Sequence, residues 1–126
     1  MPESEHKRSD YDSVKSALIS TVIESWRFSR VFERLLTKLD AGEQNRHRGQ
    51  FRWFLKKMEE GLEKAGLRIV NVEGQLFDPG MAATPINIDE FESEDELIVE
   101  QMLEPIIMGS DGVVKTGTVT LRKVQQ

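Results

Sequence analysis

The sequence predicts an α+β fold in which a long helical hairpin precedes a small, mostly antiparallel β-domain. Residues 12–39 contain no glycine or proline and repeat apolar side chains at three- and four-residue steps, and residues 46–65 continue that pattern. Beyond Gly66 the apolar residues fall into short alternating runs separated by glycine and proline. The predicted parts are a disordered tail over residues 1–11, a helical hairpin over residues 12–66 and a β-domain over residues 67–126.

The helix boundaries follow from capping and turn chemistry. Residues 1–10 are polar and predict disorder, so Asp12 or Ser13 is expected to cap the first helix. Residues 40–45 contain a glycine and an asparagine and no apolar anchor, which predicts a turn. Gly66 is expected to end the second helix in a left-handed conformation.

The apolar surface of the two helices is too wide for one seam. A short connection implies an antiparallel hairpin, and two helices alone rarely cover such faces. We therefore expect a homodimer that forms a four-helix bundle. The alternative is a monomer in which the β-domain folds back over the hairpin. The residues expected at the dimer interface are Leu18, Val22, Trp26, Phe32, Leu36, Phe51, Phe54 and Met58.

The second half of the chain reads as short strands. The expected elements are a strand over residues 67–72, a second strand at Ile86 and Ile88, an exposed acidic loop over 89–96, a strand over 97–103, a hairpin turn at 109–112, and returning strands over 113–115 and 118–124.

No pattern in the sequence points to catalysis. The carboxylates of residues 89–96 suit Mg²⁺ or Ca²⁺, but they lack the Asp-x-Asp-x-Asp-Gly order of a calcium loop, so a solvated loop is favoured. His6 and His47 have no partner in the sequence that would make them bases or ligands. We expect no catalytic residue, no metal site, no cofactor and no enzymatic activity.

Composition narrows the partners and the compartment. A net charge of −5 disfavours nonspecific nucleic-acid binding, although residues 46–52 form a local basic cluster. The 126 residues include no cysteine, which fits a reducing compartment. The first residues lack an apolar signal core, and no apolar run approaches the ~18 residues of a membrane span. A cytoplasmic protein without a membrane segment is expected.

Several motifs stand in a fixed order along residues 35–123. They are Leu-Leu-x-x-x-Asp at residues 35–40, Gly66 after the second helix, Gly74 followed by Phe77-Asp78-Pro79, and Val-Thr-Leu-Arg-Lys at residues 119–123. In this order they resemble the carboxy-terminal half of GrpE, the nucleotide-exchange factor of DnaK-type chaperones.

The resemblance implies a dimeric bundle whose β-domain binds the ATPase domain of a DnaK-type chaperone and favours its open, ADP-releasing state. Such a co-chaperone needs no catalytic residue and no cofactor. Under a second interpretation, Phe77 packs within the β-domain and does not contact the partner directly. The partner-facing residues implied by the resemblance are Phe77, Asp78, Pro79, Met81, Lys115, Thr116 and Gly117.

The sequence also departs from the family pattern. Residues 80–84 carry no charge where the family has a charged run, and Glu104-Pro105 stands in place of a Gly-Tyr pair. A first helix that begins near residue 12 leaves room for only a short stalk, so functions that the family assigns to its stalk are not expected. These departures favour a second interpretation, a dimeric adaptor on a GrpE-like scaffold without exchange activity.

Overall fold

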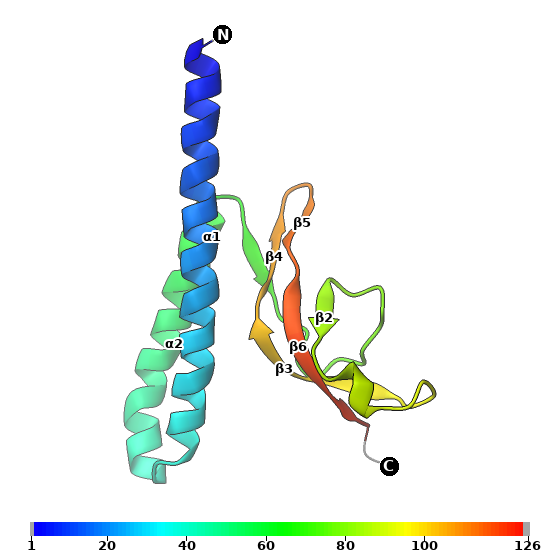
Figure 1. Cartoon of the computed structure of the whole chain (residues 1–126). Helices are drawn as coiled ribbons and strands as arrows, with labels where there is room; N and C mark the ends of the chain where they lie inside the picture. The colour runs from blue at the N-terminus through cyan, green and yellow to red at the C-terminus, as the bar shows by residue number, and fades with distance from the viewer. Residues whose placement is uncertain (1, 125–126) are drawn as a thin grey trace. The chain divides into compact units, whose positions relative to one another are not determined.

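The computed structural model describes residues 2–124, with the exception of the side chains of residues 2–6 and 8. The chain divides into two compact units, the helical unit Met1–Ala65 and the β unit Gly66–Gln126 (Figure 1). Helices alone build the first unit, and short, mostly antiparallel strands build the second. The predicted α+β class and the order of hairpin and β-domain are confirmed.

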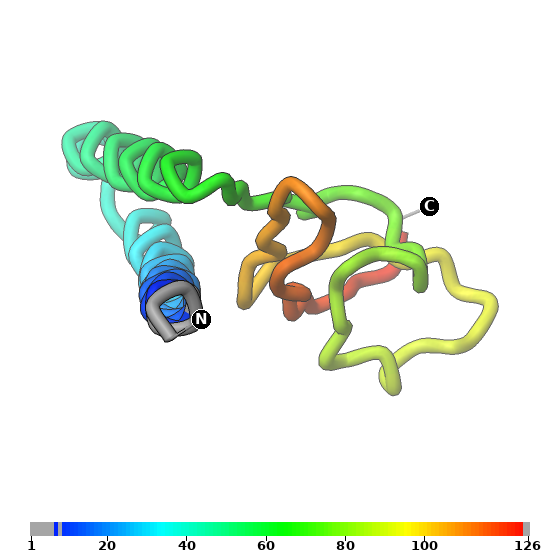
Figure 2. Tube along the Cα trace, turned by 90° about the horizontal axis from the view of Figure 1, so that it is seen from above, coloured from blue at the N-terminus to red at the C-terminus, as the bar shows by residue number. Residues whose placement is uncertain are grey.

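The helical unit is an antiparallel hairpin. Helix α1 spans Pro2–Thr37 and helix α2 spans Ala41–Lys64, and α2 runs back alongside α1 (Figures 1 and 2). The rings of Phe32 and Phe51 stack across the hairpin with centroids 5.7 Å apart. This contact fixes which faces of the two helices meet.

Helix α1 begins earlier than expected. The structure places residues 2–11 in the helix, so the predicted disordered tail is wrong there, while Met1 lies outside the described residues. The only proline of this stretch stands at position 2, where the first helical turn needs no amide donor. No glycine follows before Gly42, and a helix once nucleated adds residues at little further cost. Asp12 and Ser13 therefore lie inside α1 and do not cap it.

Helix α2 also begins earlier, at Ala41 and not at residue 46, so the predicted turn over residues 40–45 is wrong. Asp40 is the N-cap, and its Oδ1 accepts a hydrogen bond from the backbone N of Glu43 at 2.9 Å. The side chain of Gln44 donates back to the carbonyl oxygen of Leu39 at 3.0 Å. These bonds satisfy groups that otherwise lack partners at a helix start, and they outweigh the low helix propensity of the glycine that follows.

We expect Asp40→Ala to lower the free energy of unfolding of the helical unit by about 1 kcal/mol, because the amide of Glu43 loses its acceptor. Asp40→Asn keeps a side-chain oxygen at the cap and should stay within about 0.5 kcal/mol of the wild type. Urea unfolding followed by circular dichroism at the helical band measures both values. Equal stability of Asp40→Ala and Asp40→Asn would contradict the assigned cap.

Over residues 66–124 the β unit forms two three-stranded sheets, in the orders β1-β4-β5 and β2-β6-β3. Every pair is antiparallel except β2 with β6. Val99, Met102, Ile107 and Val119 are fully buried and form the centre of its core. The strands are β1 Arg68–Val70, β2 Ala83–Pro85, β3 Leu97–Glu104, β4 Ile106–Gly109, β5 Gly112–Lys115 and β6 Gly117–Lys123.

The second strand lies slightly before its expected place. It covers Ala83–Pro85, whereas Ile88–Glu90 forms a single 3₁₀ turn, η1. Asn87 explains the shift, because its Oδ1 accepts from the N of Leu121 at 2.8 Å and its Nδ2 donates to the Leu121 carbonyl at 2.9 Å. The amide side chain thus replaces strand pairing with β6 and lets the chain turn away. The expected helix stop is confirmed, since Gly66 has φ +73°.

Candidate functional site

The segment before Phe77-Asp78-Pro79 pairs with the edge of β3. Gly74 N donates to the carbonyl of Val99 at 2.8 Å, Val99 N donates to Gln75 O at 2.9 Å, and Phe77 N donates to Leu97 O at 2.8 Å. Phe77 is half-buried. These bonds hold the motif in place and leave part of its aromatic ring at the surface.

The motif then makes a tight turn. Oδ1 of Asp78 accepts from the backbone N of Gly80 at 2.9 Å, and the Asp78 carbonyl accepts from Met81 N at 2.9 Å. An aspartate that bonds to a backbone amide two residues ahead stabilises such a turn without a partner protein. Pro79 is exposed at its tip, and Met81 is half-buried.

The structure brings this turn beside the other predicted contact segment. Gly117 N donates to the carbonyl of Ala82 at 2.9 Å, and Gly117 is aligned with Ala83 at the start of the parallel β2–β6 pair (Figure 1). Ala82, which follows Met81, therefore contacts Gly117, which follows the exposed Thr116. Two segments separated by more than thirty residues in the chain thus lie side by side.

Lys115 and Gly117 differ in what they offer to a partner. Lys115 is half-buried at the end of β5, and its Nζ donates to the Thr116 carbonyl at 3.1 Å. Gly117 is buried, so it presents no side-chain surface. A Cβ at Gly117 would lie 2.8 Å from Cγ1 of Ile106 and 2.9 Å from the carbonyl oxygen of Glu104. Gly117 is therefore a packing residue that allows β6 to approach β4.

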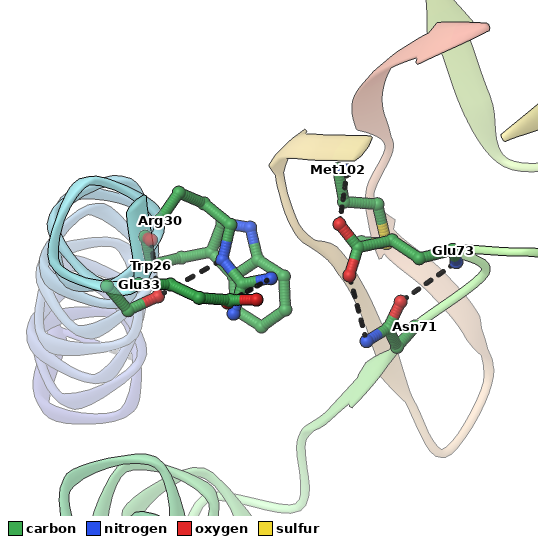
Figure 3. A network of polar contacts seen from close by, with 7 residues as sticks. Trp26, Arg30, Glu33, Asn71, Glu73 and Met102 are labelled. Atoms are coloured by element: carbon green, nitrogen blue, oxygen red, sulfur yellow. Dashed lines mark hydrogen bonds and ion pairs between the residues drawn. The ribbon is translucent and has the colours of Figure 1, made fainter. Parts of the chain in front are cut away.

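A polar network fixes the chain just ahead of the motif. Glu73 Oε2 accepts from Met102 N at 2.9 Å, and Glu73 N donates to Oδ1 of Asn71 at 2.9 Å (Figure 3). Val72 N lies 3.3 Å from Sδ of Met102. The sequence did not predict this role of Glu73, because its partner Met102 in β3 lies 29 positions away and no local sequence pattern indicates the contact.

The charge of the β unit is strongly negative. Residues 66–126 contain 11 acidic and 4 basic residues, a net −7, whereas residues 1–65 contain 11 acidic and 13 basic residues, a net +2. Six of the 11 acidic residues of the β unit lie within residues 89–96, and that stretch contains no basic residue. A surface of this kind attracts a positively charged partner.

The helical unit exposes a separate aromatic surface. Phe28 is 66% exposed and Phe54 38% exposed. They border a groove of about 170 Å³ between α1 and α2 that is also lined by Ser29, Phe32, Gln50 and Phe51. We call this surface the aromatic face of the hairpin.

The predicted dimer-interface residues differ in their exposure within the single chain. Val22, Trp26 and Leu36 are 4%, 4% and 6% exposed, so they are buried within the single chain. Trp26 carries the guanidinium of Arg30 at 4.2 Å from its ring centroid, and Arg30 pairs with Glu33 at 3.4 Å (Figure 3). Of the other predicted interface residues, Phe54 is exposed, and the half-buried ones are Leu18, Phe32, Phe51 and Met58.

Among the described residues, no three His, Cys, Asp or Glu side chains gather closely enough to hold a metal ion. Neither helix, over its described residues, combines the length and the apolar character that crossing a bilayer requires. Comparison with models of known protein families, with curated proteins and with solved structures gave no match.

Proposed function

We propose that this chain is a GrpE-like co-chaperone that promotes ADP release from a DnaK-type chaperone by binding its ATPase domain. The observation that carries the proposal is the bond from Gly117 to Ala82, which joins the Phe77-Asp78-Pro79 turn to the β5–β6 hairpin. The two segments implied by the resemblance to contact the chaperone thus form one surface. The cytoplasm is the proposed compartment.

The mechanism requires differential binding and no chemistry. An exchange factor accelerates ADP release if it binds the open state of the ATPase domain better than the closed state. A tenfold shift of that equilibrium needs about 1.4 kcal/mol of differential contact. The rigid Asp78 turn and the exposed Pro79 suit this role, because a preformed surface loses little entropy on binding.

The active form is a homodimer in this proposal. The aromatic face of the hairpin leaves Phe28 and Phe54 exposed beside the stacked pair of Phe32 and Phe51. Clustered aromatic side chains are typical of interface centres and are costly to leave in water. A second hairpin that packs on this face completes a four-helix bundle.

The direct test measures release of a fluorescent ADP analogue from each DnaK-type chaperone of the same organism. We expect the full chain to accelerate release by about tenfold or more with one of them, as expected for about 1.4 kcal/mol of differential binding. Met81→Asp should abolish most of the acceleration, because it adds a charge to the joined surface. Asn45→Asp adds the same charge to an exposed position of α2 and should leave the rate unchanged. Absence of acceleration with every chaperone would refute the proposal.

The alternative candidate function is that of a dimeric adaptor or assembly module on the same scaffold, without exchange activity. Two observations favour it: residues 80–84 carry no charge, and Glu104 is used inside the β unit, where it accepts from the hydroxyl of Thr118 at 2.8 Å. An adaptor would bind its partner and leave the rate of ADP release unchanged. Binding and release measured on the same samples separate the two functions.

A further inference from the structure

The described residues of the β unit leave an open groove. Its volume is about 530 Å³, which is within the range of peptide and ligand sites. The apolar lining comes from the segment of the Phe77 turn, from η1 and from the start of β3. The apolar residues are Leu76, Phe77, Pro79, Ile88, Phe91 and Leu97.

Part of the apolar lining is exposed to solvent. Leu76 is 60% exposed and Ile88 is 42% exposed, whereas Leu97, at the same groove, is 8% exposed. A surface with neighbouring exposed aliphatic and aromatic side chains costs free energy in water, about 25 cal/mol per Å² of apolar area. An apolar side chain of a binding partner would remove that cost.

The rim of the groove is acidic. Glu92, Asp95 and Glu96 line it, within the run of six acidic residues at positions 89–96. Asp95 is used locally, because its Oδ2 accepts from Glu92 N at 2.9 Å and lies 3.6 Å from Nζ of Lys123. Glu92 and Glu96 are exposed. The apolar lining of the groove therefore favours an apolar side chain of a partner, and the acidic rim favours positively charged side chains.

The loop that forms the rim is built to keep its shape. The bond from Glu92 N to Asp95 closes it, and Val124 N donates to the carbonyl of Glu96 at 3.0 Å. Asn87 ties the preceding turn to β6. A groove held by side-chain and backbone bonds on both sides is preformed, so binding does not require the loop to be ordered first.

We infer that this groove binds a short segment of a partner protein in which an apolar anchor residue is flanked by lysine or arginine. The anchor packs on Leu76, Ile88 and Phe91, and the flanking cations lie against Glu92 and Glu96. The net charge of −7 on the β unit adds long-range attraction for the same segment. The inference goes beyond the proposed exchange activity, because it concerns the chemistry of the bound segment and holds for an adaptor as well.

The test uses the full chain and three labelled hexapeptides, with binding followed by fluorescence anisotropy. Lys-Arg-Leu-Phe-Lys-Arg should bind about tenfold more tightly than Lys-Arg-Gly-Gly-Lys-Arg, which lacks the anchor, and than Glu-Asp-Leu-Phe-Glu-Asp, which reverses the charge. The dissociation constant of the first peptide should rise as salt increases from about 0.05 to 0.5 M. Equal affinity for the three peptides, or no binding of the first, would overturn the inference.

Variants locate the binding on the groove. Ile88→Asp and Glu92→Lys change exposed side chains of the apolar lining and the rim, and each should weaken the first peptide about tenfold. Glu63→Lys makes the same charge change on an exposed position of α2 and should have no effect. Unchanged affinity in both groove variants, with circular dichroism matching the wild type, would also overturn the inference. The assay contains no chaperone and no nucleotide, so its outcome is independent of the ADP-release test.

Discussion

Replacing Phe28 with aspartate is expected to convert the protein from a dimer to a monomer. The ring of Phe28 is 66% exposed in the single chain and borders the groove between α1 and α2. In the proposed bundle the substitution removes an aromatic contact and buries an unpaired carboxylate. We expect the dissociation constant of the dimer to rise about 100-fold or more, which corresponds to about 3 kcal/mol. Sedimentation equilibrium over a range of protein concentrations measures it.

The hairpin provides a matched control for this prediction. Trp53 is 63% exposed, so its accessible fraction is close to that of Phe28. It stands two positions after Phe51, and residues two apart on a helix point to different faces, so Trp53 lies away from the aromatic face. Nζ of Lys57 covers its ring at 5.7 Å. Trp53→Asp should therefore leave the dimer intact.

Two results would count against the dimer. A wild-type chain that sediments as a monomer at tens of micromolar would exclude it outright. Equal weakening by Phe28→Asp and Trp53→Asp would mean that the second copy does not pack on the aromatic face. The β unit serves as an internal reference, because neither substitution lies in it and its amide hydrogen exchange should stay unchanged.

The helical hairpin was predictable because its signal is long and local. Apolar residues at three- and four-residue steps over more than fifty positions outweigh any single exception. The ends of the helices were not predictable in the same way. A polar composition indicated disorder over residues 1–11, yet a long helix extends through it. At α2 the glycine at position 42 suggested a turn, whereas the cap supplied by Asp40 decided the start of the helix.

Periodicity also left open which part of a wide apolar surface is covered. It ranked Val22, Trp26 and Leu36 with Phe32, but the single chain buries the first three and leaves Phe28 exposed. In the β unit the turn at Asp78 followed from its residue types. Its pairing with Gly117 did not, because a parallel strand pair depends on residues far apart in the chain. Sequence reasoning identified both segments of the candidate site but not the bond that joins them.

The second prediction with a large expected effect concerns Gly117→Val, at the bond from Gly117 N to Ala82 O. A Cβ at this position would approach Ile106 Cγ1 to 2.8 Å and Glu104 O to 2.9 Å, and one of these is a backbone atom that cannot rotate away. The start of β6 must therefore move, and the bond from Gly117 N to Ala82 O is strained or lost. Overpacking of a tight site costs about 1–3 kcal/mol, and the valine methyl groups place the loss at the upper end. Any exchange activity should fall together with this stability, because the Phe77-Asp78-Pro79 turn is no longer held beside the start of β6.

The measurement can assign this loss to one unit. Both tryptophans and the single tyrosine lie in residues 1–65, so their fluorescence reports unfolding of the helical unit, which Gly117→Val should leave unchanged. Amide hydrogen exchange of Val119 and Leu121, which are buried in β6, reports the β unit and should lose protection. Gly80→Ala is the control, because its added Cβ meets only the Asp78 side chain at 3.5 Å or more, an ordinary contact that should cost less than about 0.5 kcal/mol. If Gly117→Val kept wild-type protection in β6, the close approach of β4 and β6 would not be what requires glycine at this position.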